Sequence, residues 1–243
     1  MQTAYAMQQN KITILSTRPL GNMLVDEAKR QSVYIDTLSF IETEPIQNIE
    51  VQQEIELALL ESATVVFTSM NAVEAVATYM IDEQPDWAIY CMGNTTKELV
   101  KKYFGDNAIA GTASDATALA DTIIEDRNTD NVIFFCGDQR RNELPDMLQA
   151  NDIEVNEIEV YHTISVAHQI NKPYNGILFF SPSAVESFFS KNKANEQTIF
   201  FAIGNTTAAA IKKHSSNPVI VSDEPGKENL VDKAINYFVN NER

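Results

Sequence analysis

Two short motifs that each occur twice constrain the fold of this chain more than any other feature of its sequence. The first motif reads VVFTSMNAVE at 65–74 and ILFFSPSAVE at 177–186, and the second reads GNTT at 93–96 and again at 204–207. The offsets are 112 positions from Ser69 to Ser181 and 111 from Gly93 to Gly204. Motifs that recur in the same order at nearly the same offset indicate an internal duplication. We therefore expect two similar domains, with corresponding loops of both facing one ligand.

Strand-like and helix-like patterns alternate along most of the sequence. Unbroken apolar runs such as VVF, VIFF, ILFF and IFFAI suit strands that are buried on both faces of a sheet. Alternation of such runs with helical patterns predicts the α/β class, with parallel sheets, helices on both faces and right-handed crossovers. Ligands of these sheets bind beyond the carboxyl ends of the strands, and the repeated loops are expected at those ends.

Local signals predict where several helices begin. Pro19 suits the first position of a helix over 19–31, and Asp115 suits an N-cap. Arg140 and Arg141 are expected to open the helix after the strand 131–137, where positive charge opposes the helix dipole. Arginines in that place indicate an anionic partner, although a solvated surface charge is the commoner explanation.

The sequence leaves the domain boundary open between two divisions. A plain tandem repeat would divide the chain near residue 120. The segments 38–46 and 153–164 instead read as long extended stretches that no clear helix closely follows, which suits paired linkers between two domains. A length of 243 residues accommodates two domains with their own cores in either case.

The composition argues against several classes of partner. The formal net charge is −16, from 18 Lys and Arg against 34 Asp and Glu, which opposes binding to nucleic acid or to an anionic membrane. A small anion remains compatible if backbone N–H groups or a few arginines hold it. No stretch reaches the roughly 18 apolar residues of a membrane span, and the N-terminal MQTAYAMQQN reads as a loose tail rather than a secretory signal.

The cysteines and histidines show no metal-binding pattern. Cys91 and Cys136 lie inside apolar runs, which predicts buried free thiols in a reducing, cytoplasmic protein. His162, His168 and His214 lack ligand spacing, so we expect no metal site.

The repeated loops supply most of the candidate binding residues. At a strand-to-helix turn, a Ser or Asn side chain either caps the helix or hydrogen-bonds a ligand, and capping is the commoner role. In GNTT, glycine permits a tight turn, and the threonine hydroxyls and free backbone N–H groups suit a carboxylate or phosphate. A purely structural turn is the alternative. The candidates are Ser69, Asn71, Gly93, Thr95 and Thr96 in the first copy, and Ser181, Ser183, Gly204, Thr206 and Thr207 in the second.

Four further candidates lie outside the repeats. Thr17 and Arg18 follow the strand 11–16, and Arg18 either reaches a ligand or points to solvent. Arg141 belongs to the loop after the strand 131–137. Tyr161 lies in the extended segment 153–164, where its phenol either donates a proton or hydrogen bond to a ligand or serves as an interfacial aromatic.

Taken together, these motifs resemble the uroporphyrinogen-III synthase family. The resemblance rests on TRP at 17–19, FTSMNAVE, both GNTT helix starts, G-x-x-RR-x-x-LP at 137–145, VY-x-T at 160–163, FFSPSAVESF and AIGNTTAAAI. They follow the family's order from about residue 11 to residue 240. No single motif is diagnostic, and the combination carries the resemblance.

This resemblance implies two flavodoxin-like domains, each a doubly wound parallel sheet, joined by a two-stranded linker. Domain one would comprise 1–38 and 165–243, domain two 47–153, and the linker strands 39–46 and 154–164. The resemblance thus selects the linker division over a cut near residue 120.

The implied activity is cyclisation of the linear tetrapyrrole hydroxymethylbilane to uroporphyrinogen III, with loss of water and inversion of ring D. The family needs no cofactor or metal. The resemblance is also compatible with a monomer that contacts the upstream hydroxymethylbilane synthase only transiently. The competing hypothesis is a non-catalytic bilobal binding protein for an anionic metabolite, because fold alone does not decide function.

The resemblance also assigns roles to individual residues. Tyr161 matches a family tyrosine expected to assist loss of the hydroxyl group. The other matches are the cleft threonines Thr96 and Thr207, the strand-end serines Ser69 and Ser181, and a recurring arginine, Arg141. Met70 departs from the small residue or proline that many relatives carry.

Overall fold

The structure is a computed structural model that describes residues 11–80, 84–224 and 226–241. The chain divides into two compact units: unit one comprises 1–42 and 164–243, and unit two comprises 43–163. A division near residue 120 would fall inside helix α5 (Ala116–Asp126) of unit two. The N-terminal tail expected at 1–10 lies outside the described residues. Within the described ranges, no helix is long and apolar enough to cross a membrane.

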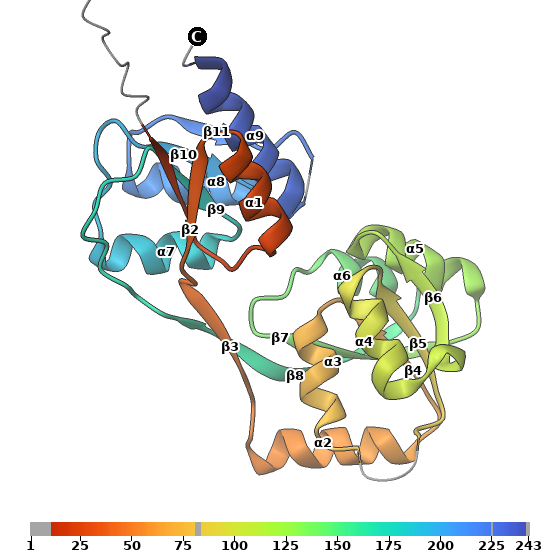
Figure 1. Cartoon of the computed structure of the whole chain (residues 1–243). Helices are drawn as coiled ribbons and strands as arrows, with labels where there is room; N and C mark the ends of the chain where they lie inside the picture. The colour runs from red at the N-terminus through yellow and green to blue at the C-terminus, as the bar shows by residue number, and fades with distance from the viewer. Residues whose placement is uncertain (1–10, 81–83, 225, 242–243) are drawn as a thin grey trace, which may run out of the picture. The chain divides into compact units, whose positions relative to one another are not determined.

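Unit one is built on a five-stranded parallel sheet with helices on both faces (Figure 1). Its strands lie in the order β2 (Val33–Thr37), β1 (Ile12–Ser16), β9 (Gly176–Phe179), β10 (Ile199–Ala202) and β11 (Val219–Val221). Its helices are α1 (Asn22–Arg30), α7 (Pro182–Lys191), α8 (Asn205–His214) and α9 (Lys227–Asn241). Successive residues of β9 face opposite sides: Phe179 packs against α7 and α8, whereas Leu178 packs against α1 and α9. Both faces of the sheet are therefore buried, as the apolar run ILFF predicts.

Unit two contains a six-stranded sheet that is also covered on both faces (Figure 1). Its strands lie in the order β3 (Ile41–Pro45), β8 (Glu154–Ser165), β7 (Asn131–Gly137), β4 (Ala63–Phe67), β5 (Trp87–Met92) and β6 (Ile109–Ala113). The helices are α2 (Ile49–Leu60), α3 (Met70–Ala77), α4 (Thr95–Phe104), the short 3-10 helix η1 (Asp106–Ala108), α5 and α6 (Glu143–Gln149). Phe67 packs against α3 and α4, and its neighbour Val66 packs against α5 and α6.

The five strands of unit one correspond in their spatial order to five of the six strands of unit two, although the chain visits them in different orders. The order β2-β1-β9-β10-β11 in unit one corresponds to β8-β7-β4-β5-β6 in unit two. The serine motif follows β9 and β4, and GNTT follows β10 and β5. In unit one, however, β9 to β11 come after β1 and β2, whereas in unit two β4 to β6 come before β7 and β8. The two units are thus related by a circular permutation of the same α/β arrangement.

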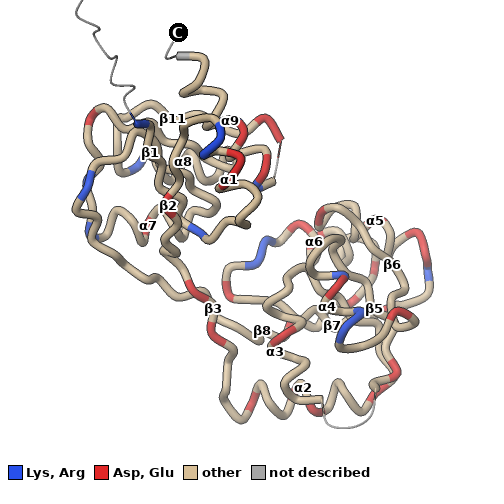
Figure 2. The backbone as a smooth tube through the Cα atoms, viewed as in Figure 1, with Lys and Arg blue, Asp and Glu red and all other residues tan. Residues whose placement is uncertain are grey.

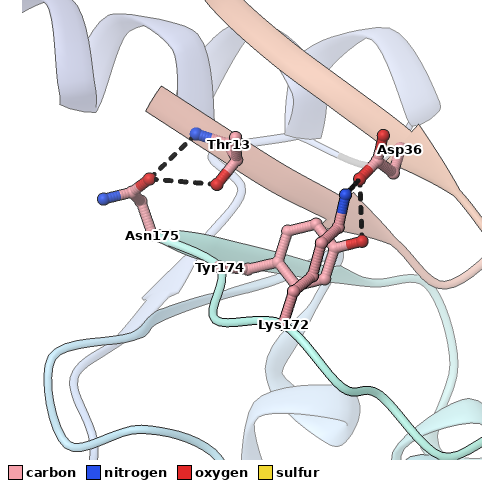
Figure 3. Close-up of polar contacts among 5 residues, drawn as sticks. All are labelled: Thr13, Asp36, Lys172, Tyr174 and Asn175. Atoms are coloured by element: carbon pink, nitrogen blue, oxygen red, sulfur yellow. Dashed lines mark hydrogen bonds and ion pairs between the residues drawn. The ribbon is translucent and has the colours of Figure 1, made fainter. Parts of the chain in front are cut away.

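Two sets of polar contacts fasten the segment before β9 to the rest of unit one (Figure 3). The Lys172 Nζ lies 2.5 Å from Asp36 Oδ2, and the Tyr174 hydroxyl donates to the same oxygen at 2.8 Å. The amide oxygen of Asn175 accepts hydrogen bonds from the backbone N–H of Thr13 at 2.8 Å and from its hydroxyl at 3.2 Å. The hydrogen bond from Lys172 is the main reason that the pKa of Asp36 is lowered. These contacts fix the chain on its entry into the central strand β9.

The local helix signals are confirmed in one case and wrong in others. Asp115 caps α5, because its Oδ1 accepts from the Ala118 N–H at 2.9 Å. Helix α1 begins at Asn22 with Gly21 as N-cap, so Pro19 lies in the preceding loop and not at the first helical position. The expectation that no helix closely follows 38–46 is also wrong, since β3 ends at Pro45 and α2 begins at Ile49.

Candidate functional site

The serine motifs form the same helix cap at the carboxyl edge of each sheet. Ser69 is the N-cap of α3, and its Oγ accepts from the Asn71 N–H at 3.1 Å. Ser181 is the N-cap of α7, and its Oγ accepts from the Ala184 N–H at 3.2 Å. The capping role is therefore confirmed for both serines. An accepting hydroxyl still carries its own proton, so capping leaves each serine able to donate to a ligand. Ser183, in the first turn of α7, is half-buried.

The two GNTT copies adopt different backbone conformations despite their identical sequences. In unit two, α4 begins at Thr95 and its N-cap is Asn94, with φ 60° and ψ −129°. In unit one, α8 begins at Asn205 and its N-cap is Gly204, with extended φ −170° and ψ 175°. A positive φ is uncommon outside glycine, and asparagine is among the residues that tolerate it best. The repeat therefore keeps the position of a helix N-terminus but not its entry conformation.

Thr96 and Thr207 place hydroxyl groups inside these two helix starts. Their exposed fractions are 7% and 1%, and neither hydroxyl hydrogen-bonds to another described residue. The preceding Thr95 and Thr206 are exposed, and Gly93 and Gly204 are half-buried. Both hydroxyls can therefore donate a hydrogen bond to a ligand without breaking one within the protein.

Tyr161 lies on β8 and meets the first serine motif. Its hydroxyl donates to Ser69 Oγ at 3.1 Å, so β8 and the N-terminus of α3 meet at one point. The structure thus brings together Tyr161, Ser69 and Asn71 from segments that are far apart in the sequence. Burial is the largest cause that raises the pKa of Tyr161, while the hydrogen bond with Ser69 opposes it. The phenol is therefore protonated near neutral pH and available as a donor.

The turn after β7 also contacts Tyr161, through Gly137 and Asp138. The sheet register between β7 and β8 shifts between Cys136 and Gly137, and Gly137 then faces Tyr161. The Asp138 N–H donates to the Tyr161 carbonyl at 3.2 Å, and Asp138 Oδ1 accepts from the Thr163 N–H at 2.8 Å. Asp138 was not among the sequence candidates, because a register shift between strands leaves no signal in the sequence of either strand.

The two arginines of this turn do not open a helix. Helix α6 begins at Glu143, so Arg140 and Arg141 precede it, and their predicted place in the first helical turn is wrong. The Arg140 guanidinium pairs with Glu157 and hydrogen-bonds to Asn142, so its charge is already matched. Arg141 is exposed and forms no ion pair or hydrogen bond with another described residue.

In unit one, Thr17 and Arg18 follow β1 at the same edge of the sheet. Thr17 is fully buried, and both its hydroxyl and its N–H donate to the Leu178 carbonyl, at 2.8 and 3.1 Å. This hydroxyl therefore serves the sheet itself in this conformation. Arg18 is exposed, and its guanidinium carbon lies 5.7 Å from the centre of the Phe180 ring. A cation over an aromatic face is held in place. Burial lowers the pKa of Arg18, and the nearby Glu228 carboxylate opposes that shift.

The net negative charge of the chain belongs to unit two, although acidic residues occur in both units (Figure 2). Residues 43–163 contain 6 Lys and Arg against 23 Asp and Glu, a net charge of −17. The remaining residues contain 12 Lys and Arg against 11 Asp and Glu, a net charge of +1. The net charge of unit two therefore opposes the binding of a polyanion, so an anion at unit two would need local N–H and hydroxyl donors.

The remaining polar groups point to no other chemistry. Cys91 and Cys136 are both free and buried, and burial raises their pKa values to about 11 and about 12. Across 11–80, 84–224 and 226–241, no three His, Cys, Asp or Glu side chains gather as a metal-binding group.

Fold and edge residues together define an α/β protein with parallel sheets and two related units, each with helix N-termini and hydroxyl groups at the carboxyl edge of its sheet. A family model described as uroporphyrinogen-III synthase HemD matches residues 24–232. Because this match covers most of its length, the chain belongs to the uroporphyrinogen-III synthase family, whose members are lyases of porphyrin and heme biosynthesis.

Solved structures share the fold at low sequence identity. The uroporphyrinogen-III synthetase of Helicobacter pylori is 16% identical and superposes with a TM-score of 0.64, covering 93% of this chain and 99% of that chain. A mutant uroporphyrinogen III synthase of the extremely thermophilic bacterium Thermus thermophilus is 12% identical with a TM-score of 0.56, covering 96% of this chain and 100% of that one. These neighbours show that the mixed α/β architecture is common to the family.

Proposed function

We propose that this chain cyclises hydroxymethylbilane to uroporphyrinogen III, with loss of water and inversion of ring D, and that Tyr161 assists the loss of the hydroxyl group. The observation that carries the proposal is the Tyr161 hydroxyl, held 3.1 Å from Ser69 Oγ at the N-terminus of α3 in a chain of this family. The raised pKa of Tyr161 keeps its proton at neutral pH, so the phenol can protonate the departing oxygen.

The surroundings of Tyr161 suit the negative charge that develops on its phenol oxygen when it gives up its proton. When the C–O bond breaks and the oxygen takes the proton, water departs and negative charge develops on the phenol oxygen. Ser69 is placed to donate a hydrogen bond to that oxygen. The N-terminus of α3, which Ser69 caps, favours negative charge through its dipole. This stabilisation is strongest in the transition state, which is the condition for rate acceleration.

The substrate's eight carboxylates account for the other edge residues. We assign carboxylate binding to the helix starts of α3, α4, α7 and α8, where backbone N–H groups are unpaired within the helix. The hydroxyls of Thr96 and Thr207 lie inside two of these helix starts and lack partners among the described residues. The exposed Arg18 and Arg141 add positive charge. The remaining proposed contacts are Ser69, Asn71, Gly93, Thr95, Ser181, Ser183, Gly204 and Thr206. The Thr17 hydroxyl is bonded to the Leu178 carbonyl and is not assigned to the substrate.

Orientation is the main task in this reaction, because hydroxymethylbilane closes unaided to the isomer without ring inversion. Holding ring D so that its substituted carbon meets the reactive methylene of ring A requires many weak contacts rather than one strong catalyst. We therefore propose that Tyr161 contributes to the rate and that no single residue is indispensable. A non-catalytic binding protein would not need the pairing of Tyr161 with Ser69.

We further propose that the units act as two doubly wound domains, 1–38 with 165–243 and 47–153, linked by the strands 39–46 and 154–164. The strand order of unit one, 2-1-3-4-5, is that of flavodoxins, whereas unit two has the order 3-2-1-4-5 found in dinucleotide-binding folds plus an edge strand. The flavodoxin comparison therefore suits unit one alone. We propose a cytoplasmic monomer that receives its unstable substrate through transient contact with hydroxymethylbilane synthase.

The decisive assay incubates the protein with freshly made hydroxymethylbilane, oxidises the products and separates the uroporphyrin isomers. We expect isomer III well above the control without enzyme, and isomer I alone would refute the activity. Tyr161→Phe should lower kcat about 100-fold, the lower range for loss of a general acid. His162→Ala, an exposed neighbour on β8, should stay within about twofold, since surface substitutions are usually near neutral. Equal activity of the two folded variants would exclude Tyr161 from this role.

A further inference from the structure

We propose that Gly137 and Asp138 are positioning residues for Tyr161: the turn after β7 holds the phenol in place through close contact with its ring and a clamp on its backbone. This inference rests on the proposed role of Tyr161 and adds the residues that set its geometry. Neither residue needs to touch the substrate.

The Tyr161 ring packs directly against the backbone of Gly137, so there is no space for a side chain at position 137. A Cβ added at Gly137 would lie 2.3 Å from Tyr161 Cζ, 2.4 Å from Cε2 and 2.8 Å from the hydroxyl oxygen. Ordinary contacts begin near 3.4 Å, so an alanine would push the ring away by about 1 Å. Gly137 is not among the described glycines with positive φ, so alanine causes no backbone strain there. The smallness of Gly137 is therefore what the site uses, as in sheets where another group approaches closely.

Asp138 clamps the strand on both sides of His162. Its N–H donates to the Tyr161 carbonyl, and its carboxylate accepts from the Thr163 N–H at 2.8 Å. These bonds replace the regular ladder that is interrupted at the register shift after Cys136. Because the hydrogen bond from Tyr161 to Ser69 is the link to α3, a displaced strand end would break the alignment on which the chemistry depends.

The first test combines Gly137→Ala with Tyr161→Phe. In the wild-type background, Gly137→Ala should lower kcat by up to about 100-fold at similar KM, since a misplacement of about 1 Å can cost that much. In the Tyr161→Phe background, the same substitution should change kcat by less than twofold. Gly21→Ala is the matched control, because a Cβ at Gly21 meets nothing within 4 Å. Equal losses in both backgrounds would overturn the inference.

A second measurement does not depend on activity. With ¹³C at the tyrosine Cζ, the resonance that Tyr161→Phe removes reports on this phenol. Gly137→Ala should shift that resonance and Gly21→Ala should not, and an unshifted resonance would overturn the inference. If Tyr161→Phe proves fully active, the catalytic role of Tyr161 fails and this spectrum alone decides whether Gly137 positions the ring.

Asp138 provides a variant pair in case Gly137→Ala does not fold. Asp138→Ala removes the acceptor for the Thr163 N–H and should shift the Tyr161 resonance and lower kcat. Asp138→Asn keeps an oxygen in the same place, so resonance and kcat should return close to the wild-type values. Failure of the asparagine to restore either one, in a folded protein, would contradict the clamp.

Discussion

Three buried threonines allow stability and function to be separated experimentally. Thr17 and Thr207 are each no more than 1% exposed, and Thr96 is 7% exposed. The Thr17 hydroxyl donates to the Leu178 carbonyl at 2.8 Å, whereas those of Thr96 and Thr207 have no partner among the described residues. Replacement by valine keeps the branched shape and removes only the hydroxyl, so Thr17→Val should behave in the opposite way to the other two variants.

The expected changes in stability follow from the hydrogen-bond partner of each threonine hydroxyl. Thr17→Val loses one buried hydrogen bond and should lower the free energy of unfolding by about 1 kcal/mol. The Leu178 carbonyl keeps the Thr17 N–H as a donor, which keeps the loss from being larger. Thr207→Val loses no hydrogen bond within the free protein, so its free energy of unfolding should stay within about 1 kcal/mol of the wild-type value, the worth of one such bond.

Activity should show the reverse order. A hydroxyl that donates to a substrate carboxylate contributes about 1.5–3 kcal/mol, so kcat/KM should fall roughly tenfold to 150-fold in Thr207→Val and Thr96→Val. Thr17→Val should stay within about threefold when assayed well below its unfolding temperature, because a hydroxyl bonded within the sheet has no ligand to lose.

Urea unfolding and initial rates of uroporphyrinogen III formation measure both quantities on the same samples. The assignment is refuted if Thr207→Val lowers stability by more than about 1 kcal/mol, on the order of one hydrogen bond, while its activity is unchanged. In that case the hydroxyl would serve the fold, and α8 would lose its proposed carboxylate contact.

Two further predictions concern the backbone and pH. Asn94→Gly should raise the free energy of unfolding by about 0.5–1 kcal/mol in urea titrations, because φ 60° with ψ −129° suits glycine. The control Asn205→Gly, at the first position of α8, should lower it by roughly 0.5 kcal/mol. A loss of stability in both variants would contradict the strain at Asn94. The pKa of Asp36 is lowered in the folded state, chiefly by the hydrogen bond from Lys172, so its stabilisation is present above the ordinary value of 3.8 and disappears as pH falls through the folded pKa. The stability difference between wild type and Asp36→Asn, roughly a few tenths of a kcal/mol after solvent screening, should therefore shrink as the pH is lowered from neutral to below that ordinary value, and a constant difference would refute this linkage.

The strands were predictable because their signal is local and strong. The runs ILFF and IFFAI became β9 and β10, buried on both faces, since only a doubly covered sheet tolerates such runs. The helix starts at Pro19 and Arg140 were misplaced because their signals permit a turn as readily as a first helical turn. Helix α1 instead begins after Gly21, where no residue provides a side-chain cap.

The contacts of the candidate site were not predictable in the same way. The hydrogen bond between Tyr161 and Ser69 joins residues that are 92 positions apart, and no local pattern encodes that distance. The identical GNTT sequences entered their helices through different backbone conformations, because the preceding strands and their neighbours set the entry. The charge imbalance between the units was also hidden, since it emerges only once the boundaries at 42–43 and 163–164 are known.

The circular permutation explains why the repeat misleads about the boundary. A duplication normally divides a chain where the second copy begins, and the offset of 112 positions places that division near residue 120. Here the first copy, β4-α3-β5-α4, comes before β7 and β8 of unit two, whereas the second copy, β9-α7-β10-α8, comes after β1 and β2 of unit one. The motifs recur because each must lie at the carboxyl ends of the same two central strands. The order of the chain around them is free to differ, since parallel strands joined by crossovers can begin at any connection. A repeated motif in such a chain therefore locates equivalent places in two sheets, and the domain boundary has to be read from the strands that flank them.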